Sequence, residues 1–162
     1  MPTYRAPRRD IQFVMHEVLA MAEHYKTLPG GEDMDADMID AILEEAAKFS
    51  ENVLAPINAS GDEQGCSWND GVVTTPDGFK QAYSQYVDGG WPTLAAPQAF
   101  GGQGLPLALS NAVTEMMNSN IGFQLCPMLS NGGMEALSAH ATDEQKQKYL
   151  HKVVSGEWTA TM

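Results

Sequence analysis

The chain has 162 residues, of which 43% are hydrophobic and 19% are charged, a balance typical of a folded globular protein and not of a disordered one. Its 21 acidic and 9 basic residues give a formal net charge of -12, which disfavours association with nucleic acid. No apolar run reaches the roughly 18 residues that a membrane span needs. The two cysteines, Cys66 and Cys126, have no metal-like spacing and predict reduced thiols in a cytoplasmic protein.

Two amphipathic helices are predicted in the first third of the chain. Asp10 is placed to cap the first, over residues 11–28, where apolar residues recur at helical spacing before Pro29-Gly30-Gly31 ends it. Asp35 is placed to cap the second, and Pro56 should bend or end that helix near Leu54. The predicted buried face of the second helix consists of Met38, Ile39, Ile42, Ala46, Phe49 and Val53.

The middle of the chain is rich in turn-forming residues. Residues 58–74 lack periodicity and predict a surface loop, after which Thr75-Pro76 should begin a third helix that Gly89-Gly90 ends. The sequence Gly101-Gly102-Gln103-Gly104 has two interpretations. A tight structural turn is favoured, because a phosphate-binding loop would need a lysine, a serine or threonine, and a preceding strand.

The last third predicts three more helices. The first covers residues 105–119, and the second, residues 121–140, is apolar on nearly all sides and should lie in the interior. Its glycines at 122, 132 and 133 weaken a helix, so they predict a close approach of another backbone or a ligand. A capping box at Thr142 and Gln145 begins the sixth helix, which Ser155-Gly156 closes. The predicted fold is an all-α bundle of about six helices that ends, at residues 157–162, at the start of a β-strand.

The sequence selects no catalytic residue and no metal site. Glu115 and Glu135 have apolar neighbours, and burial there could raise a pKa enough for general-base work, but nothing distinguishes either one. No serine has the setting of a hydrolase nucleophile. The histidines have no zinc-binding spacing and are interpreted as solvated surface residues: His16, His24, His140 and His151.

Three segments together resemble the N-terminal helical domain of the flavin-dependent acyl-CoA dehydrogenases. They are W-P-T-L-A-A-P-Q-A-F-G-G-Q-G-L-P at 91–106, A-T-D-E-Q-K-Q-K-Y-L at 141–150 and S-G-E-W-T-A-T-M at 155–162. The resemblance covers residues 35–162, and the combination is far more specific than any one segment. The opening, Y-R-A-P-R-R-D-I-Q-F-V-M-H-E-V-L, is similar to the extra N-terminal helix of a large-subunit bacterial branch that includes the methylmercaptopropionyl-CoA dehydrogenase type.

The resemblance implies an extension with one helix at 1–34, the helical domain at 35–156, and the start of a central β-domain at 157–162. It implies an enzyme that oxidises an acyl-CoA thioester to its 2,3-enoyl form with hydride transfer to FAD. An electron-transfer acceptor and a homo-oligomeric parent protein are implied as well. By the same resemblance, Gln124, Leu125 and Met128 wall the acyl pocket and Met162 touches the flavin. The catalytic base and most of the flavin site would follow residue 162, so we expect the chain alone to be inactive.

Two other functions remain open from the sequence. The chain could be a free-standing helical interaction module that binds a partner through residues 121–140 and its tail. It could also be an acyl-binding bundle that needs only a cavity. The length of the parent protein separates the first of these from the enzyme, and a titration with acyl-CoA and free fatty acid tests the second.

Overall fold

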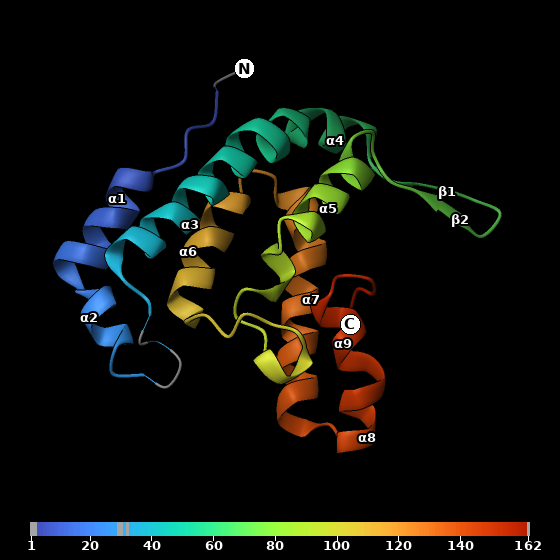
Figure 1. The fold of residues 1–162 in the computed structure, drawn as a ribbon. Helices are drawn as coiled ribbons and strands as arrows, with labels where there is room; N and C mark the ends of the chain where they lie inside the picture. Colours follow the sequence, from blue (N-terminus) through green and yellow to red (C-terminus); the bar gives the residue numbers. More distant parts are fainter. Residues whose placement is uncertain (1–2, 29–30, 32, 162) are drawn as a thin grey trace. The chain divides into compact units, whose positions relative to one another are not determined.

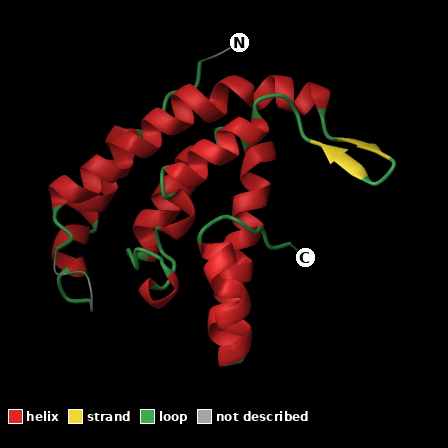
Figure 2. Cartoon of the chain, turned by 45° about the vertical axis from the view of Figure 1, so that its right-hand side comes forward, coloured by secondary structure: helices red, strands yellow, loops and turns green. Residues whose placement is uncertain are grey.

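The computed structural model describes residues 3–28, 31 and 33–161, and these are helical apart from turns and one small hairpin (Figure 1, Figure 2). The predicted all-α fold is confirmed. The chain divides into two compact units, which are described separately: unit 1 comprises Met1–Pro56 and Leu105–Asn120, and unit 2 comprises Ile57–Gly104 and Ile121–Met162. Within the described ranges, no helix combines the length and apolar character needed to span a membrane.

The first segment of unit 1 is two short helices, where the sequence predicts one. Helix α1 (Arg8–Gln12) runs into a π-helical stretch (Phe13–Val18), and α2 (Met21–Tyr25) follows a break at Ala20, whose backbone is left-handed with φ 46°. The buried Met15 and Met21 would be about 120° apart around one continuous helix, so the break allows both to be buried. The predicted stop at Pro29-Gly30 lies outside the described residues.

Asp10 is not a helix cap, because α1 begins two residues before it. Pro7 precedes the helix with φ -77°, close to the helical value, and so favours the earlier start. Asp10 instead lies in the first turn, where its negative charge complements the positive end of the helix dipole.

Helix α3 (Ala36–Phe49) begins as the sequence predicts, with the Met38 amide donating to Asp35 Oδ1 at 2.8 Å. The helix packs against α6 (Leu107–Met117), and Figure 1 shows the two lying side by side. The predicted buried face is rotated: Met38 is 41% exposed, while Leu43, which the prediction omits, is fully buried with Ile39. The buried residues of this helix recur at three- and four-residue spacing: Ile39, Leu43, Ala46 and Ala47.

The end of this helix changes its hydrogen-bonding pattern near Pro56, as the sequence predicts. A π-helical stretch (Ser50–Leu54) and a 3-10 turn (Ala55–Ile57) follow α3, because proline has no N–H to continue the α-helical ladder. Two side chains after α6 satisfy carbonyls of the altered stretch. Ser119 Oγ donates to the Ser50 carbonyl at 3.4 Å, and the buried Asn120 donates Nδ2 to the Leu54 carbonyl at 3.0 Å.

A hydrogen bond between side chains links the N-terminal segment to α3. His16 Nε2 lies 2.7 Å from Asp40 Oδ1, so the prediction that the histidines are solvated surface residues is wrong for His16. Partial burial alone would raise the pKa of Asp40. Hydrogen bonds to His16 and Gln12, with the nearby positive charges of His16 and Arg8, outweigh burial and hold that pKa below its ordinary value.

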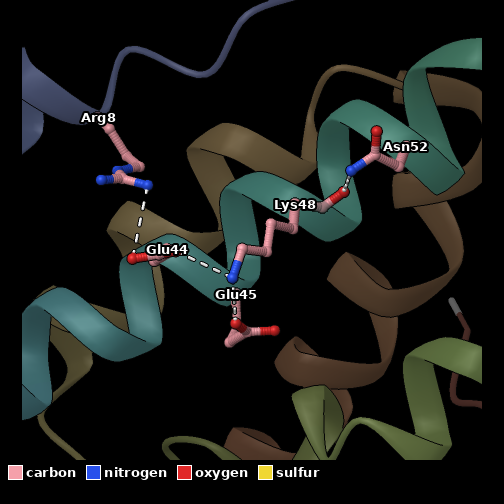
Figure 3. A network of polar contacts seen from close by, with 5 residues as sticks. All are labelled: Arg8, Glu44, Glu45, Lys48 and Asn52. Carbon is pink, nitrogen blue, oxygen red and sulfur yellow. Dashed lines mark hydrogen bonds and ion pairs between the residues drawn. The ribbon is translucent and has the colours of Figure 1, made fainter.

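A surface network on α3 adds further contacts to the same segment (Figure 3). Glu44 lies 3.8 Å from Arg8 and 2.9 Å from Lys48, whose ammonium also contacts Glu45 at 2.8 Å. Asn52 Nδ2 donates to the Lys48 carbonyl. These side chains are exposed, so the ion pairs add little to stability. The pair of Arg8 and Glu44 joins α1 to α3, whereas Lys48 pairs with Glu44 and Glu45 within α3.

Unit 2 begins with an element that the sequence analysis missed. Residues 58–74, predicted as a loop, form helix α4 (Asn58–Gln64) and an antiparallel hairpin of β1 (Ser67–Asn69) and β2 (Val72–Thr74). Asp70 and Gly71 both have positive φ, as a two-residue hairpin turn requires, so the Asp-Gly pair was the available signal. All six strand residues are exposed, and the hairpin extends away from α4 in both views (Figure 1, Figure 2).

The remaining helices of unit 2 follow the predicted order. Helix α5 (Phe79–Asp88) ends before Gly89 as expected, but it begins after Gly78 and takes no cap from Thr75. Helix α7 (Ile121–His140) has the predicted bounds. The capping box is confirmed at the start of α8 (Asp143–Gln145), which continues through a π-helical stretch (Lys146–Leu150) into α9 (His151–Val154). A buried cluster joins α7, the π-helical stretch and α9 to the turn that carries Ala96: Ala96, Met134, Leu150, Val153 and Val154.

Candidate functional site

Helix α7 presents an exposed apolar stripe. Ile121, Leu125 and Met128 follow each other at four- and three-residue spacing and are 55%, 50% and 45% exposed. Residues at this spacing lie on one face of a helix. The prediction that α7 lies wholly in the interior is therefore wrong for this stripe. Adjacent exposed apolar side chains of this size are typical of a surface that covers a ligand or another part of a protein.

Gln124 lies next to this stripe but is not part of it. Its side chain is 1% exposed, and its Oε1 has no hydrogen-bond partner among the described residues. A buried acceptor without a partner costs about 1–3 kcal/mol, so such an atom in a folded protein needs an explanation. The structure thus brings Leu125 and Met128 together and leaves Gln124 as a buried polar group beside them.

The aromatic packing around α7 fixes this part of the helix. Phe123 packs edge-on against Phe79 and Tyr86, with ring centroids 6.1 Å and 6.0 Å apart. Burial raises the pKa of Tyr86, with smaller contributions from Tyr83 and Cys126. Pro127 lies inside the helix one turn later and is buried. These contacts hold the turn that carries Gln124 in place.

The segment at residues 157–161 lies against α7 and has neither helical nor strand pairing among the described residues. The Ala160 amide donates to Ser130 Oγ at 3.1 Å, and the same hydroxyl donates to the Cys126 carbonyl at 3.1 Å. Burial raises the pKa of the Cys126 thiol, and a side-chain hydrogen bond with Thr159 partly offsets the effect.

Gly133 provides the close approach that the glycines of this helix predict. A Cβ atom placed on Gly133 would lie 2.4 Å from Ala160 Cβ, far inside van der Waals contact. At Gly132, nothing lies within 4 Å of the corresponding position. The close approach is therefore specific to Gly133, where it allows residues 157–161 to pack against α7.

The glycine-rich turn at residues 101–104 is structural. Its four amides donate to the carbonyls of Gln98, Pro97, Thr93 and Ala96, in chain order, at 2.8–3.0 Å. Amides used in this way are not directed at a phosphate group. The structure thus contradicts the phosphate-loop interpretation and supports the tight turn.

The other sequence candidates do not assemble into a site. Glu115 and Glu135 are both exposed, so neither has the burial that would favour general-base work. Among the residues that the structure describes, no group of three or more histidine, cysteine or acidic side chains could hold a metal ion. Both cysteines are described, and neither forms a disulfide. Met162, the predicted flavin contact, lies outside the described residues.

Comparison with known proteins agrees with the helical fold and with the segments singled out in the sequence. The family model of the acyl-CoA dehydrogenase N-terminal domain matches residues 37–157, which is most of the chain. The molecule is therefore an all-α domain of the type that this family model describes. The chain belongs to the acyl-CoA dehydrogenase family.

Curated relatives match nearly the whole chain. A 3-methylmercaptopropionyl-CoA dehydrogenase of Ruegeria pomeroyi is 41% identical over 161 residues, which cover 99% of this chain and 27% of the relative. A butyryl-CoA dehydrogenase of Syntrophomonas wolfei is 30% identical over 168 residues, 98% of this chain and 27% of the relative. A broad-specificity linear acyl-CoA dehydrogenase of Mycobacterium tuberculosis is 26% identical over 167 residues, 100% of this chain and 26% of the relative. The chain thus spans about a quarter of the length of these relatives.

The sequence analysis missed the polar contacts of the 157–161 segment. Ser130 carried no signal of its own, because one serine on an apolar helix commonly bonds to a carbonyl four residues earlier. The glycine pair at 132 and 133 was the usable signal, although the sequence could not tell which of the two faces a neighbour.

Proposed function

We propose that the chain is the N-terminal domain of a flavin-dependent acyl-CoA dehydrogenase and closes one side of its acyl pocket. The observation that carries the proposal is the match of nearly the whole chain to a 3-methylmercaptopropionyl-CoA dehydrogenase at 41% identity. The reaction proposed for the complete protein converts an acyl-CoA thioester to its 2,3-enoyl form. An electron-transfer acceptor and a homo-oligomeric state in the cytoplasm belong to the same proposal.

In this proposal, the exposed stripe of α7 walls the acyl chain. Leu125 and Met128 supply apolar surface, and methionine is flexible and polarisable enough to adapt to different chains. Gln124 contributes a buried amide beside this wall, whose oxygen is available to accept from a group or water in the pocket. Because relatives are named for both short and broad linear substrates, we assign this chain to acyl-CoA thioesters without a chain length.

FAD supplies the hydride acceptor when it is bound to the complete protein. The part of this chain that fits a role near the cofactor is the 157–161 segment. Ser130 and Gly133 hold this segment against α7, and the side chains of Thr159 and Thr161 are exposed. The proposed role of Met162 extends the same segment by one residue.

The first test compares the 162-residue chain with the complete protein that its native gene encodes. We expect the chain alone to bind no FAD at stoichiometric levels and to oxidise no thioester, because the resemblance places the catalytic base and most of the flavin site after residue 162. The complete protein should carry a flavin absorbance band and reduce a dye when given an acyl-CoA. A stoichiometric flavin band on the chain alone, or a complete gene product of only 162 residues, would contradict the proposal.

The pocket assignment predicts an effect of side-chain bulk at Met128. In the complete protein, Met128→Phe should lower kcat/KM for longer acyl-CoA substrates more than for short ones, because the ring fills space along the wall. We expect the ratio between long and short substrates to change on the order of tenfold, the lower end of the effect of one methylene group in a hydrophobic pocket. Steady-state kinetics with a series of saturated acyl-CoA thioesters measures this ratio.

Glu135→Gln is the matched control for that experiment. Glu135 is exposed on the same face of the helix but seven residues, about 10 Å, beyond Met128 and past the apolar side chains of the stripe, so its substitution should leave the ratio unchanged. An equal loss for all chain lengths in Met128→Phe would mean that Met128 does not line the acyl pocket.

The alternative function, a free-standing interaction module, draws on the same exposed stripe. It requires the native protein to end near the length of this chain. The intact mass of the native gene product therefore decides between the two functions.

A further inference from the structure

We propose that Ser130 and Gly133 are positioning residues, which fix the backbone of residues 159–161 on α7 and thereby set the place of the flavin-facing segment. The inference rests on the proposed function for its last step, the link to the flavin. The contact between α7 and the segment does not depend on that step.

The contact is built from polar and steric elements one turn apart. Ser130 Oγ accepts from the Ala160 amide at 3.1 Å, and it donates to the Cys126 carbonyl at 3.1 Å. Its hydrogen bond to the Cys126 carbonyl orients the Ser130 hydroxyl, so that a lone pair of its oxygen faces the Ala160 amide.

Gly133 supplies the steric part of the contact. With a hydrogen in place of a side chain, it lets Ala160 approach so closely that any Cβ on Gly133 would lie 2.4 Å from Ala160 Cβ. Ala160 in turn packs against the buried cluster that includes Leu150 and Val154. The methyl group of Ala160 thus lies between α7 and the last helix, and it cannot move away without leaving this cluster.

The other end of the segment is also held. The Trp158 amide donates to the Lys152 carbonyl at 3.0 Å, and the Trp158 ring lies 6.3 Å from that of Tyr149. Residues 158 and 160 are therefore fixed to two different helices of unit 2. A segment held at both points has little freedom to shift. In the complete protein, these contacts would therefore set the distance between the segment and FAD.

The test uses a matched pair of glycine substitutions in the complete protein. Gly133→Ala and Gly132→Ala bring the same gain in helix propensity, but only the first meets Ala160. We expect Gly133→Ala to lower the hydrogen-exchange protection of the Ala160 amide and to raise the dissociation constant of FAD on the order of tenfold. Gly132→Ala should match the wild type in both measurements.

A second substitution keeps the result interpretable if Gly133→Ala folds poorly. Ala160→Gly removes the opposing methyl group, so the double variant Gly133→Ala/Ala160→Gly should recover FAD affinity relative to Gly133→Ala. Ser130→Ala should lower protection of the Ala160 amide by removing its acceptor, with no steric change. Exchange is followed by mass spectrometry, and FAD affinity by fluorescence titration of the apoprotein.

The outcomes separate this inference from the proposed function. If the wild-type complete protein binds no FAD, the proposed function is wrong, and so is the proposed link between residues 159–161 and the flavin. If the wild type binds FAD and Gly133→Ala behaves like Gly132→Ala, the inference alone is overturned. A change in Ala160 protection without a change in FAD affinity also overturns it, because the segment would then not position the flavin.

Discussion

Gly102→Ala should destabilise unit 2 by about 2–4 kcal/mol, the range of severe steric substitutions in packed structure. A Cβ on Gly102 would lie 2.0 Å from the Ala96 carbonyl oxygen and 2.7 Å from Ala96 Cβ. The first of these is a backbone atom, which cannot rotate away as the end of a side chain can. The same oxygen accepts from the Gly104 amide at 3.0 Å, so a shift there also weakens the turn.

Denaturant unfolding of the 162-residue chain measures this effect. Gly132→Ala is the matched control, because the position is helical and open, and it should stabilise the chain by up to about 1 kcal/mol. The two substitutions add the same methyl group and should change stability in opposite directions. A loss below about 1 kcal/mol in Gly102→Ala would show that the turn adapts to a Cβ, contrary to its hydrogen bonding.

Ile39→Ala should cost unit 1 about 2–5 kcal/mol, as expected for removal of a large side chain from a closely packed core. Ile39 is fully buried on α3, the helix that packs against α6. Its neighbour Met38 is 41% exposed, and Met38→Ala should change stability by less than about 1 kcal/mol.

Thermal or denaturant unfolding of both variants checks the orientation of α3. The pair is informative because the sequence pattern places both residues on the buried face, whereas the structure buries only Ile39. Comparable losses for the two variants would mean that the helix is rotated from its position in the structure.

Where local chemistry decides the structure, the sequence is a good guide. The Asp35 cap and the capping box of Thr142 and Gln145 were predictable, because each needs only a few neighbouring residues. The bounds of α7 were predictable from its long run of apolar residues. The break at Ala20 was not, because an alanine in the left-handed region is locally unfavourable and is accepted only for the packing of its neighbours.

The candidate site was less predictable than the fold. The resemblance selected Gln124, Leu125 and Met128, but no periodicity indicates that Gln124 is buried while the other two are exposed. The contact of Ser130 with Ala160 joins residues 30 positions apart, and such a distant pairing leaves no local pattern. Sequence reasoning found the glycine pair there and needed the structure to show that Gly133 is the residue in contact.

The exposed hairpin is a place where residues can be inserted into this chain. Its turn at Asp70 and Gly71 closes on strands whose residues are all exposed, and the ladder joins only neighbouring residues, such as Asn69 with Val72. Extra residues placed between Asp70 and Gly71 would lengthen the ribbon and leave the buried cluster of unit 2 untouched. The tip of the hairpin is therefore a natural position for a fluorophore, an epitope or an inserted peptide.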